Sequence, residues 1–166
     1  GCSMIYPDEW ENYKSVIPKQ EQNNFVKAYY KRLTSKNKNI RLKAATAWSK
    51  WEASTSKLVQ KKKSLHHFDN PKIAEAFARI ECHYFINNAF FNTDNWILKN
   101  INKIKHIPGA IIQGRYDVVC PMQSAWDLHK KLNHFEFYII NKAGHSMLEK
   151  DIQTQLIECT DRFIKY

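Results

Sequence analysis

The sequence has 166 residues, of which 43% are hydrophobic and 13% aromatic, enough apolar material for one domain with a packed core. This composition excludes a largely disordered chain. Lysine and arginine number 26 against 16 acidic residues, giving a formal net charge of +10, and such an excess attracts nucleic acid, anionic membranes or acidic proteins without selecting one of them. The densest basic run is Lys61 to Lys63, but lysine is abundant throughout, so we interpret most of the charge as solvated surface.

Cysteine spacing and hydropathy exclude several further classes. The four cysteines form no C-x-x-C pair, so we expect no metal site, no redox motif and no cofactor. The sequence has no apolar run near the roughly 18 residues of a transmembrane helix, and no signal-peptide pattern at its start. These features predict a soluble, cytoplasmic protein with reduced thiols, no membrane partner and no specific nucleic-acid partner.

The first part of the chain has the periodicity of helices. From about residue 23 to residue 84, apolar side chains recur on two helical stripes, which comprise Phe25, Val26, Tyr29, Tyr30 and Leu33 in the first, and Ile73, Phe77, Ile80 and Tyr84 in the second. Breaks are predicted at residues 34–39, where polar residues cluster, and at 61–71, which ends in an Asn-Pro pair. We therefore expect three or four helices here.

After His106 the pattern changes to strand, helix, strand, helix. Residues 108–114 and 135–140 are short apolar or β-branched runs that predict buried strands, and residues 121–132 predict a helix between them. A closing amphipathic helix is marked by Ile152, Leu156, Cys159, Thr160 and Phe163. This alternation is typical of a parallel α/β sheet. Two strands alone cannot make one, so the remaining strands must come from elsewhere.

An acid and a histidine follow the two predicted strands. Asp117 comes shortly after the first strand and His145 shortly after the second, and functional groups of open α/β sheets gather beyond the carboxyl ends of the strands. Acid before histidine is the chain order of α/β-hydrolases, in which the acid orients the imidazole and the histidine takes the proton of a serine. Taken singly, Asp117 is also explained as a turn residue and His145 as a residue flanking a helix.

The serine of such a triad is missing from the sequence. Its G-x-S-x-G turn needs two glycines four positions apart, and no pair among Gly1, Gly109, Gly114 and Gly144 has that spacing. Ser146 is a poor substitute, because neighbouring residues on one backbone seldom align for proton transfer. We predict that the nucleophile precedes this sequence and that the chain alone is inactive, since losing the serine of a triad costs on the order of a millionfold in turnover.

Several longer motifs resemble prolyl aminopeptidase, also called proline iminopeptidase, of the α/β-hydrolase superfamily. They are Tyr6 to Trp10 (YPDEW), Ala47 to Glu52 (AWSKWE), Ala78 to Phe85 (ARIECHYF), His106 to Gly109 (HIPG), Gln113 to Leu128 (QGRYDVVCPMQSAWDL) and Ala143 to Ser146 (AGHS). The resemblance implies an α/β fold, the C-terminal part of an α/β-hydrolase with its last two parallel strands and flanking helices, preceded by a mostly helical cap. The cap domain, which determines substrate specificity, would span residues 1–100, and the core part residues 101–166.

The resemblance also implies a function and its residues. It implies a serine-type exopeptidase that releases N-terminal proline from peptides, with Asp117 and His145 as the catalytic acid and histidine. Glu52 and Glu81 would hold the protonated α-amine of the substrate. Phe85 would line the pocket for the proline ring, and Cys120 would lie beside the acid near that pocket. The implied partners are peptides with an N-terminal proline and the missing N-terminal half of the enzyme.

The helical periodicity places both glutamates, Glu52 and Glu81, on apolar stripes. Glu81 falls on the apolar stripe of its helix, where a carboxylate either pairs internally or binds a cation, and Glu52 lies one turn beyond Trp48 on another stripe. Pairing with a nearby lysine or arginine is the structural alternative for both. Two other functions stay open, a non-catalytic basic module with an acidic partner and a remnant without function. We also expect the unpaired strand edge to cause aggregation or dimerisation.

Overall fold

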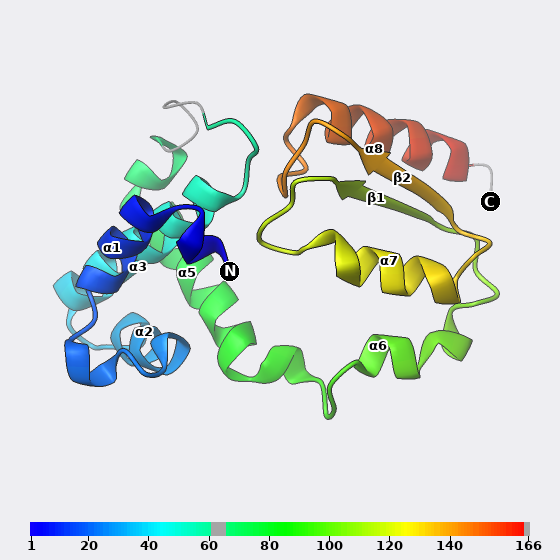
Figure 1. Cartoon of the computed structure of the whole chain (residues 1–166). Helices are drawn as coiled ribbons and strands as arrows, with labels where there is room; N and C mark the ends of the chain where they lie inside the picture. The colour runs from blue at the N-terminus through cyan, green and yellow to red at the C-terminus, as the bar shows by residue number, and fades with distance from the viewer. Residues whose placement is uncertain (61–65, 165–166) are drawn as a thin grey trace. The chain divides into compact units, whose positions relative to one another are not determined.

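The computed structural model describes residues 1–60 and 66–164, so the basic run Lys61 to Lys63 lies outside the described residues. The chain divides into two compact units (Figure 1). We call residues 1–54 and 60–91 the helical unit, and residues 55–59 and 92–166 the sheet unit. In the described ranges, no helix is both long enough and apolar enough to cross a lipid bilayer.

In the part of the helical unit that the structure describes, there are four α-helices and short 3₁₀ turns. The helices are α1 (Pro7–Ser15), α2 (Phe25–Leu33), α3 (Lys38–Thr55, whose last residue belongs to the sheet unit) and α5 (Pro71–Ile86), and the turns are Cys2–Met4, Lys19–Glu21, His66–Asp69 and Asn88–Phe90. The side chain of Asn24 caps α2 and that of Asn70 caps α5, each accepting a backbone N–H of the first turn, as is usual at helix starts. The predicted break after Leu33 and the helix start at Asn70-Pro71 are confirmed.

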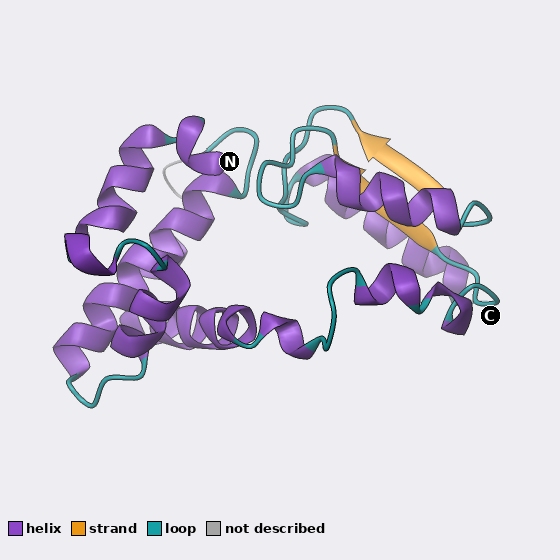
Figure 2. Cartoon of the chain, turned by 60° about the horizontal axis from the view of Figure 1, so that its bottom comes forward, coloured by secondary structure: helices purple, strands orange, loops and turns teal. Residues whose placement is uncertain are grey.

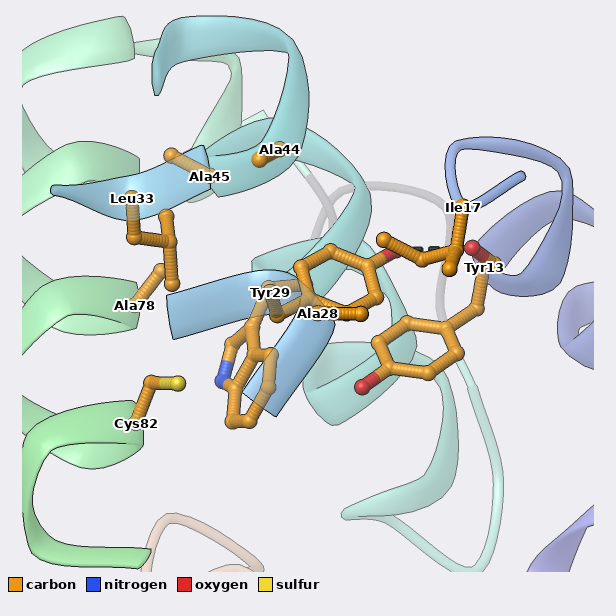
Figure 3. Packing of buried hydrophobic residues seen from close by; sticks show 10 residues of the cluster. Tyr13, Ile17, Ala28, Tyr29, Leu33, Ala44, Ala45, Ala78 and Cys82 are labelled. Carbon is orange, nitrogen blue, oxygen red and sulfur yellow. Dashed lines mark hydrogen bonds between the residues drawn. The ribbon is translucent and has the colours of Figure 1, made fainter. Parts of the chain in front are cut away.

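Aromatic side chains from three helices form the core of the helical unit. Tyr29 is completely buried, stacks on Tyr13 with ring centroids 4.4 Å apart and meets Trp48 edge-on at 5.3 Å. The Tyr29 hydroxyl donates a hydrogen bond of 2.7 Å to the backbone carbonyl of Tyr13 (Figure 3), so its buried polar group is satisfied. Figure 3 also shows the small side chains around these rings, which are Ala28, Ala44, Ala45, Ala78 and Cys82.

The buried face of α5 differs from the predicted stripe. Ala74, Ala78 and Cys82 are completely buried, whereas Ile80 is 62% exposed and Tyr84 50% exposed. The prediction was therefore wrong for Ile80 and Tyr84. The physical reason is that α5 packs against α2 through its smallest side chains, which allow the two helices to approach closely. The half-buried Glu81 still lies on the inward side, three residues after Ala78.

The sheet unit has the predicted order of elements. These are β1 (Ala110–Gly114), α7 (Met122–Lys131), β2 (Glu136–Ile140) and α8 (Lys150–Phe163), preceded by α6 (Trp96–Lys99) and a 3₁₀ turn at Ile101–Lys103. The strands pair in parallel, with Ala110 opposite Glu136 and Gly114 opposite Ile140. Helices α7 and α8 lie on opposite sides of this sheet, and both contact β1 (Figures 1 and 2). The predicted strand, helix, strand, helix order is confirmed, with Ile152 and Cys159 of α8 buried.

Candidate active site

Two loops follow the strands and lie together in the sheet unit. Because β1 and β2 are parallel, both end at the same edge of the sheet. The backbone N–H of Arg115 donates to the carbonyl of Ile140 and that of Tyr116 to the carbonyl of Ala143, both at 3.0 Å. These bonds join the loop that carries Asp117 to the loop that carries His145.

The structure brings Asp117 and His145 into direct contact. His145 Nδ1 lies 2.9 Å from Asp117 Oδ2, with 6% of the aspartate side chain exposed and 40% of the histidine side chain. Asp117 Oδ1 accepts the backbone N–H groups of Val119 (3.0 Å) and Cys120 (2.7 Å), and the side-chain amide of Gln113 donates to Oδ2 at 3.2 Å. Asp117 is thus a turn residue and a partner of the imidazole at the same time.

The environment of His145 favours its charged form. Hydrogen bonding with the Cys120 side chain is the largest cause, partial desolvation opposes it, and the hydrogen bond and charge of Asp117 add to it, so that the pKa of His145 rises to about 9. In the neutral imidazole, the bond to Asp117 favours a proton on Nδ1. Nε2 is then the nitrogen that accepts a proton.

A titration of His145 by NMR is expected to give a midpoint near pH 9 instead of the ordinary 6.5. Cys120→Ala and Asp117→Asn should each lower this midpoint, because each removes a group that favours the imidazolium. A raised histidine pKa contributes stability that is fully present below pH 6.5 and is lost as the pH rises through about 9. The pH-dependent part of the stability difference between wild type and Asp117→Asn should therefore be largest near pH 6. A wild-type midpoint at 6.5 would contradict the expectation.

The loop that carries His145 is anchored by the short segment 55–59. The carbonyl of Ser56 accepts the backbone N–H groups of His145 (2.9 Å) and Ser146 (2.7 Å). The Glu149 carboxylate accepts the N–H of Gly144 at 2.8 Å and that of Leu58 at 3.2 Å. Sequence reasoning missed both anchors. A backbone carbonyl accepts a hydrogen bond whatever side chain its residue carries, so nothing in the sequence marks Ser56 as an anchor. Glu149 could have been recognised, because it lies directly before the closing helix.

In the helical unit, Trp48 joins two of the predicted substrate-binding residues. Its indole Nε1–H donates to Glu81 Oε2 at 2.6 Å, and its ring centroid lies 5.9 Å from that of Phe85. The pKa of Tyr13 is raised, first by burial, then by Tyr29 and Glu52, and further by Glu81. The negative charge of both glutamates therefore disfavours ionisation of the Tyr13 hydroxyl.

The predicted site residues thus form two groups. Asp117, Cys120 and His145 are together in the sheet unit, while Glu81 and Phe85 share the contacts of Trp48 in the helical unit, where Glu52 also lies. Within residues 1–60 and 66–164, no group of three or more histidine, cysteine, aspartate or glutamate side chains could hold a metal ion.

Comparison with known proteins shows strong similarity to one family of enzymes. The chain is 53% identical to a probable proline iminopeptidase from Leptolyngbya boryana over 99% of its own length and 51% of that protein. It is 45% identical to a proline iminopeptidase from Xylella fastidiosa, over 99% of the chain and 52% of the relative. It is also 45% identical to a proline iminopeptidase from Arabidopsis thaliana, over 98% of the chain and 43% of the relative. The chain spans about half the length of the curated relatives it matches. No protein-family model matches it.

A solved structure shows the same fold. An esterase from Exiguobacterium antarcticum matches 85% of this chain and 47% of its own, with a TM-score of 0.51 and 14% sequence identity. At that identity the match concerns the fold alone. The predicted fold class, part of an α/β-hydrolase, and the predicted resemblance to prolyl aminopeptidases are confirmed by these comparisons.

Proposed function

Since the chain is similar to proline iminopeptidases over nearly its whole length, we propose that it is part of a serine-type prolyl aminopeptidase, which releases proline from the N-terminus of peptides. The observation that carries the proposal is the 2.9 Å contact between His145 Nδ1 and Asp117 Oδ2 at the shared edge of two parallel strands. An acid and a histidine so arranged are two members of a hydrolase triad.

In the proposed reaction, the neutral form of His145 accepts the proton of the attacking serine hydroxyl on Nε2 while Asp117 holds the proton on Nδ1. The serine oxygen bonds to the carbonyl carbon of the N-terminal proline, and the peptide bond breaks as the imidazolium returns its proton to the leaving amine. Water then hydrolyses the prolyl ester by the same proton route, releasing free proline. The buried, four-times hydrogen-bonded Asp117 is suited to orient the imidazole without moving.

Substrate selection is assigned to the helical unit, as the resemblance implies for a cap domain. Glu52 and Glu81 would hold the protonated α-amine, and Phe85 would line the space for the pyrrolidine ring. Charge-assisted hydrogen bonds from two carboxylates to one ammonium favour a free N-terminus over an internal proline, which has no charged amine to offer. The enzyme would therefore act as an exopeptidase.

The serine is assigned to residues outside this sequence, and the chain alone is predicted to be inactive. The sheet supports pairing with another segment. Its β1 strand is contacted by both α7 and α8, as a central strand of a parallel sheet is covered on both faces. Among the described residues, only β2 pairs with β1. We assign the other edge of β1 to a strand from the missing N-terminal half of the enzyme.

The test is hydrolysis of a proline arylamide by the 166-residue chain, alone and mixed with the N-terminal half of a related prolyl aminopeptidase that carries its serine. We expect hydrolysis only in the mixture. N-acetylproline arylamide, which has no charged amine, serves as the control and should resist cleavage. The proposal fails if the mixture is silent although size-exclusion chromatography shows that the two pieces associate, or if both arylamides are cleaved equally fast.

A further inference from the structure

Trp48 contacts the two residues to which the proposed function assigns the amine and the ring of the substrate. Glu81 and Phe85 are four residues apart on α5, so they project from the same side of that helix. Trp48 meets both from α3, through its indole N–H at 2.6 Å from Glu81 Oε2 and through its ring at a centroid distance of 5.9 Å from Phe85. One side chain therefore touches both halves of the predicted subsite with different parts of its indole.

The position of the Trp48 ring is fixed by the core. Only 2% of the residue is exposed, and its ring meets the completely buried Tyr29 edge-on at 5.3 Å. Tyr29 is held in turn by its stacking on Tyr13 and by its hydroxyl hydrogen bond. A close-packed ring cannot change rotamer without opening the core, so its N–H is a rigid donor that determines where the Glu81 carboxylate lies.

The charge around Trp48 suits a cationic ligand. Glu52 follows Trp48 by one turn on α3, and the influence of both glutamates on the pKa of Tyr13 indicates that negative charge gathers on this side of the core. A bond of 2.6 Å is at the short end for a donor to a carboxylate. An ionised carboxylate accepts about four hydrogen bonds, so the indole N–H does not exhaust the capacity of Glu81.

We propose that Trp48 is a positioning residue that builds the subsite for an N-terminal prolyl group. Its N–H orients Glu81 toward the ammonium of the ligand, while its buried ring lies behind Phe85, the half-exposed aromatic side chain against which the pyrrolidine ring packs. The inference rests on the proposed function for the identity of the ligand. Because Trp48, Glu52, Glu81 and Phe85 all belong to the helical unit, the subsite binds small prolyl amides without the missing half of the enzyme.

Two small probes separate the positioning role of the indole N–H from a merely structural role of the ring. L-Prolinamide has the charged amine and the five-membered ring, whereas cyclopentanecarboxamide has a ring of the same size and the carboxamide but no amine. Dissociation constants for the 166-residue chain are measured from the ¹⁵N-labelled indole resonances and from tyrosine ring resonances. Trp48→Phe keeps an aromatic ring and removes the N–H, and Glu81→Gln removes the charge. Trp126→Phe, at a 43% exposed tryptophan of the sheet unit, is the matched control.

We expect Trp48→Phe to weaken prolinamide binding about tenfold, the size of one charge-assisted hydrogen bond, and to leave the affinity for cyclopentanecarboxamide unchanged. Glu81→Gln should weaken prolinamide binding at least as much, and Trp126→Phe should change neither. Equal weakening of both probes by Trp48→Phe would reduce Trp48 to a structural role and overturn the proposal. So would unchanged prolinamide binding, or a wild-type chain that binds neither probe.

These outcomes are distinguishable from failure of the proposed function, which is judged by arylamide hydrolysis in the mixture. A mixture that hydrolyses proline arylamide while the wild-type chain ignores prolinamide would refute the subsite and leave the activity standing. Trp48-dependent binding of prolinamide with a silent mixture would establish the subsite and refute the activity.

Discussion

Gly114→Ala is expected to destabilise the sheet unit by at least about 3 kcal/mol, at the upper end of what overpacking costs. A Cβ atom at this position would lie 1.8 Å from the carbonyl oxygen of Gly144 and 2.9 Å from that of Ala143. Both are backbone atoms, so no side-chain rotation relieves the clash. The end of β1 and the loop carrying His145 would have to separate. Urea unfolding of the full chain, followed by circular dichroism, measures the effect.

Gly1→Ala is the matched control, because a Cβ atom there has nothing within 4 Å. It should leave the unfolding midpoint unchanged, as substitutions at open surface positions do. If Gly114→Ala unfolded at the same urea concentration as Gly1→Ala, the close approach of the two loops would be refuted. The Asp117 to His145 contact depends on this approach, so the His145 midpoint should also return toward its ordinary value in Gly114→Ala.

Asp117→Asn is expected to lower the turnover of the complemented enzyme about 10⁴-fold, the size of effect seen when the acid of a triad becomes an amide. An asparagine can still accept the backbone N–H groups of Val119 and Cys120, so the turn should stay folded. Its amide would donate to His145 Nδ1 and place the imidazole proton on Nε2, which then cannot accept the serine proton. The measurement is kcat for proline arylamide in the mixture.

Asp127→Asn provides the comparison for that variant. Asp127 pairs with Lys130 on α7 at 2.7 Å, and an exposed ion pair of this kind contributes little, so kcat and the melting temperature should both stay close to wild type. A loss of less than tenfold in Asp117→Asn, with an intact fold, would contradict the role assigned to Asp117.

The strands and helices could be predicted from the sequence because the local spacing of apolar residues reflects which side chains are buried. The short apolar runs before Gly114 and after Leu132 are strands, since continuous apolar stretches of this length suit a buried parallel sheet. The pattern failed on α5, where it predicted that Ile80 and Tyr84 face the core although both are exposed. The side chains of α5 that are buried, where it packs against α2, are the alanines and Cys82. The periodicity of one helix does not show which of its faces a second helix will approach closely.

By itself, the sequence determined the α/β fold class, the order of elements and the pair Asp117 and His145, because strand ends can be read locally and a parallel sheet brings such ends together. Only the tertiary structure decided that Trp48 donates to Glu81, that residues 55–59 belong to the sheet unit, and that Ser56 and Glu149 anchor the loop carrying His145. Each of these depends on which backbone or carboxylate oxygen a distant N–H group meets, and hydrogen bonds between residues far apart in the chain leave no spacing or composition to recognise.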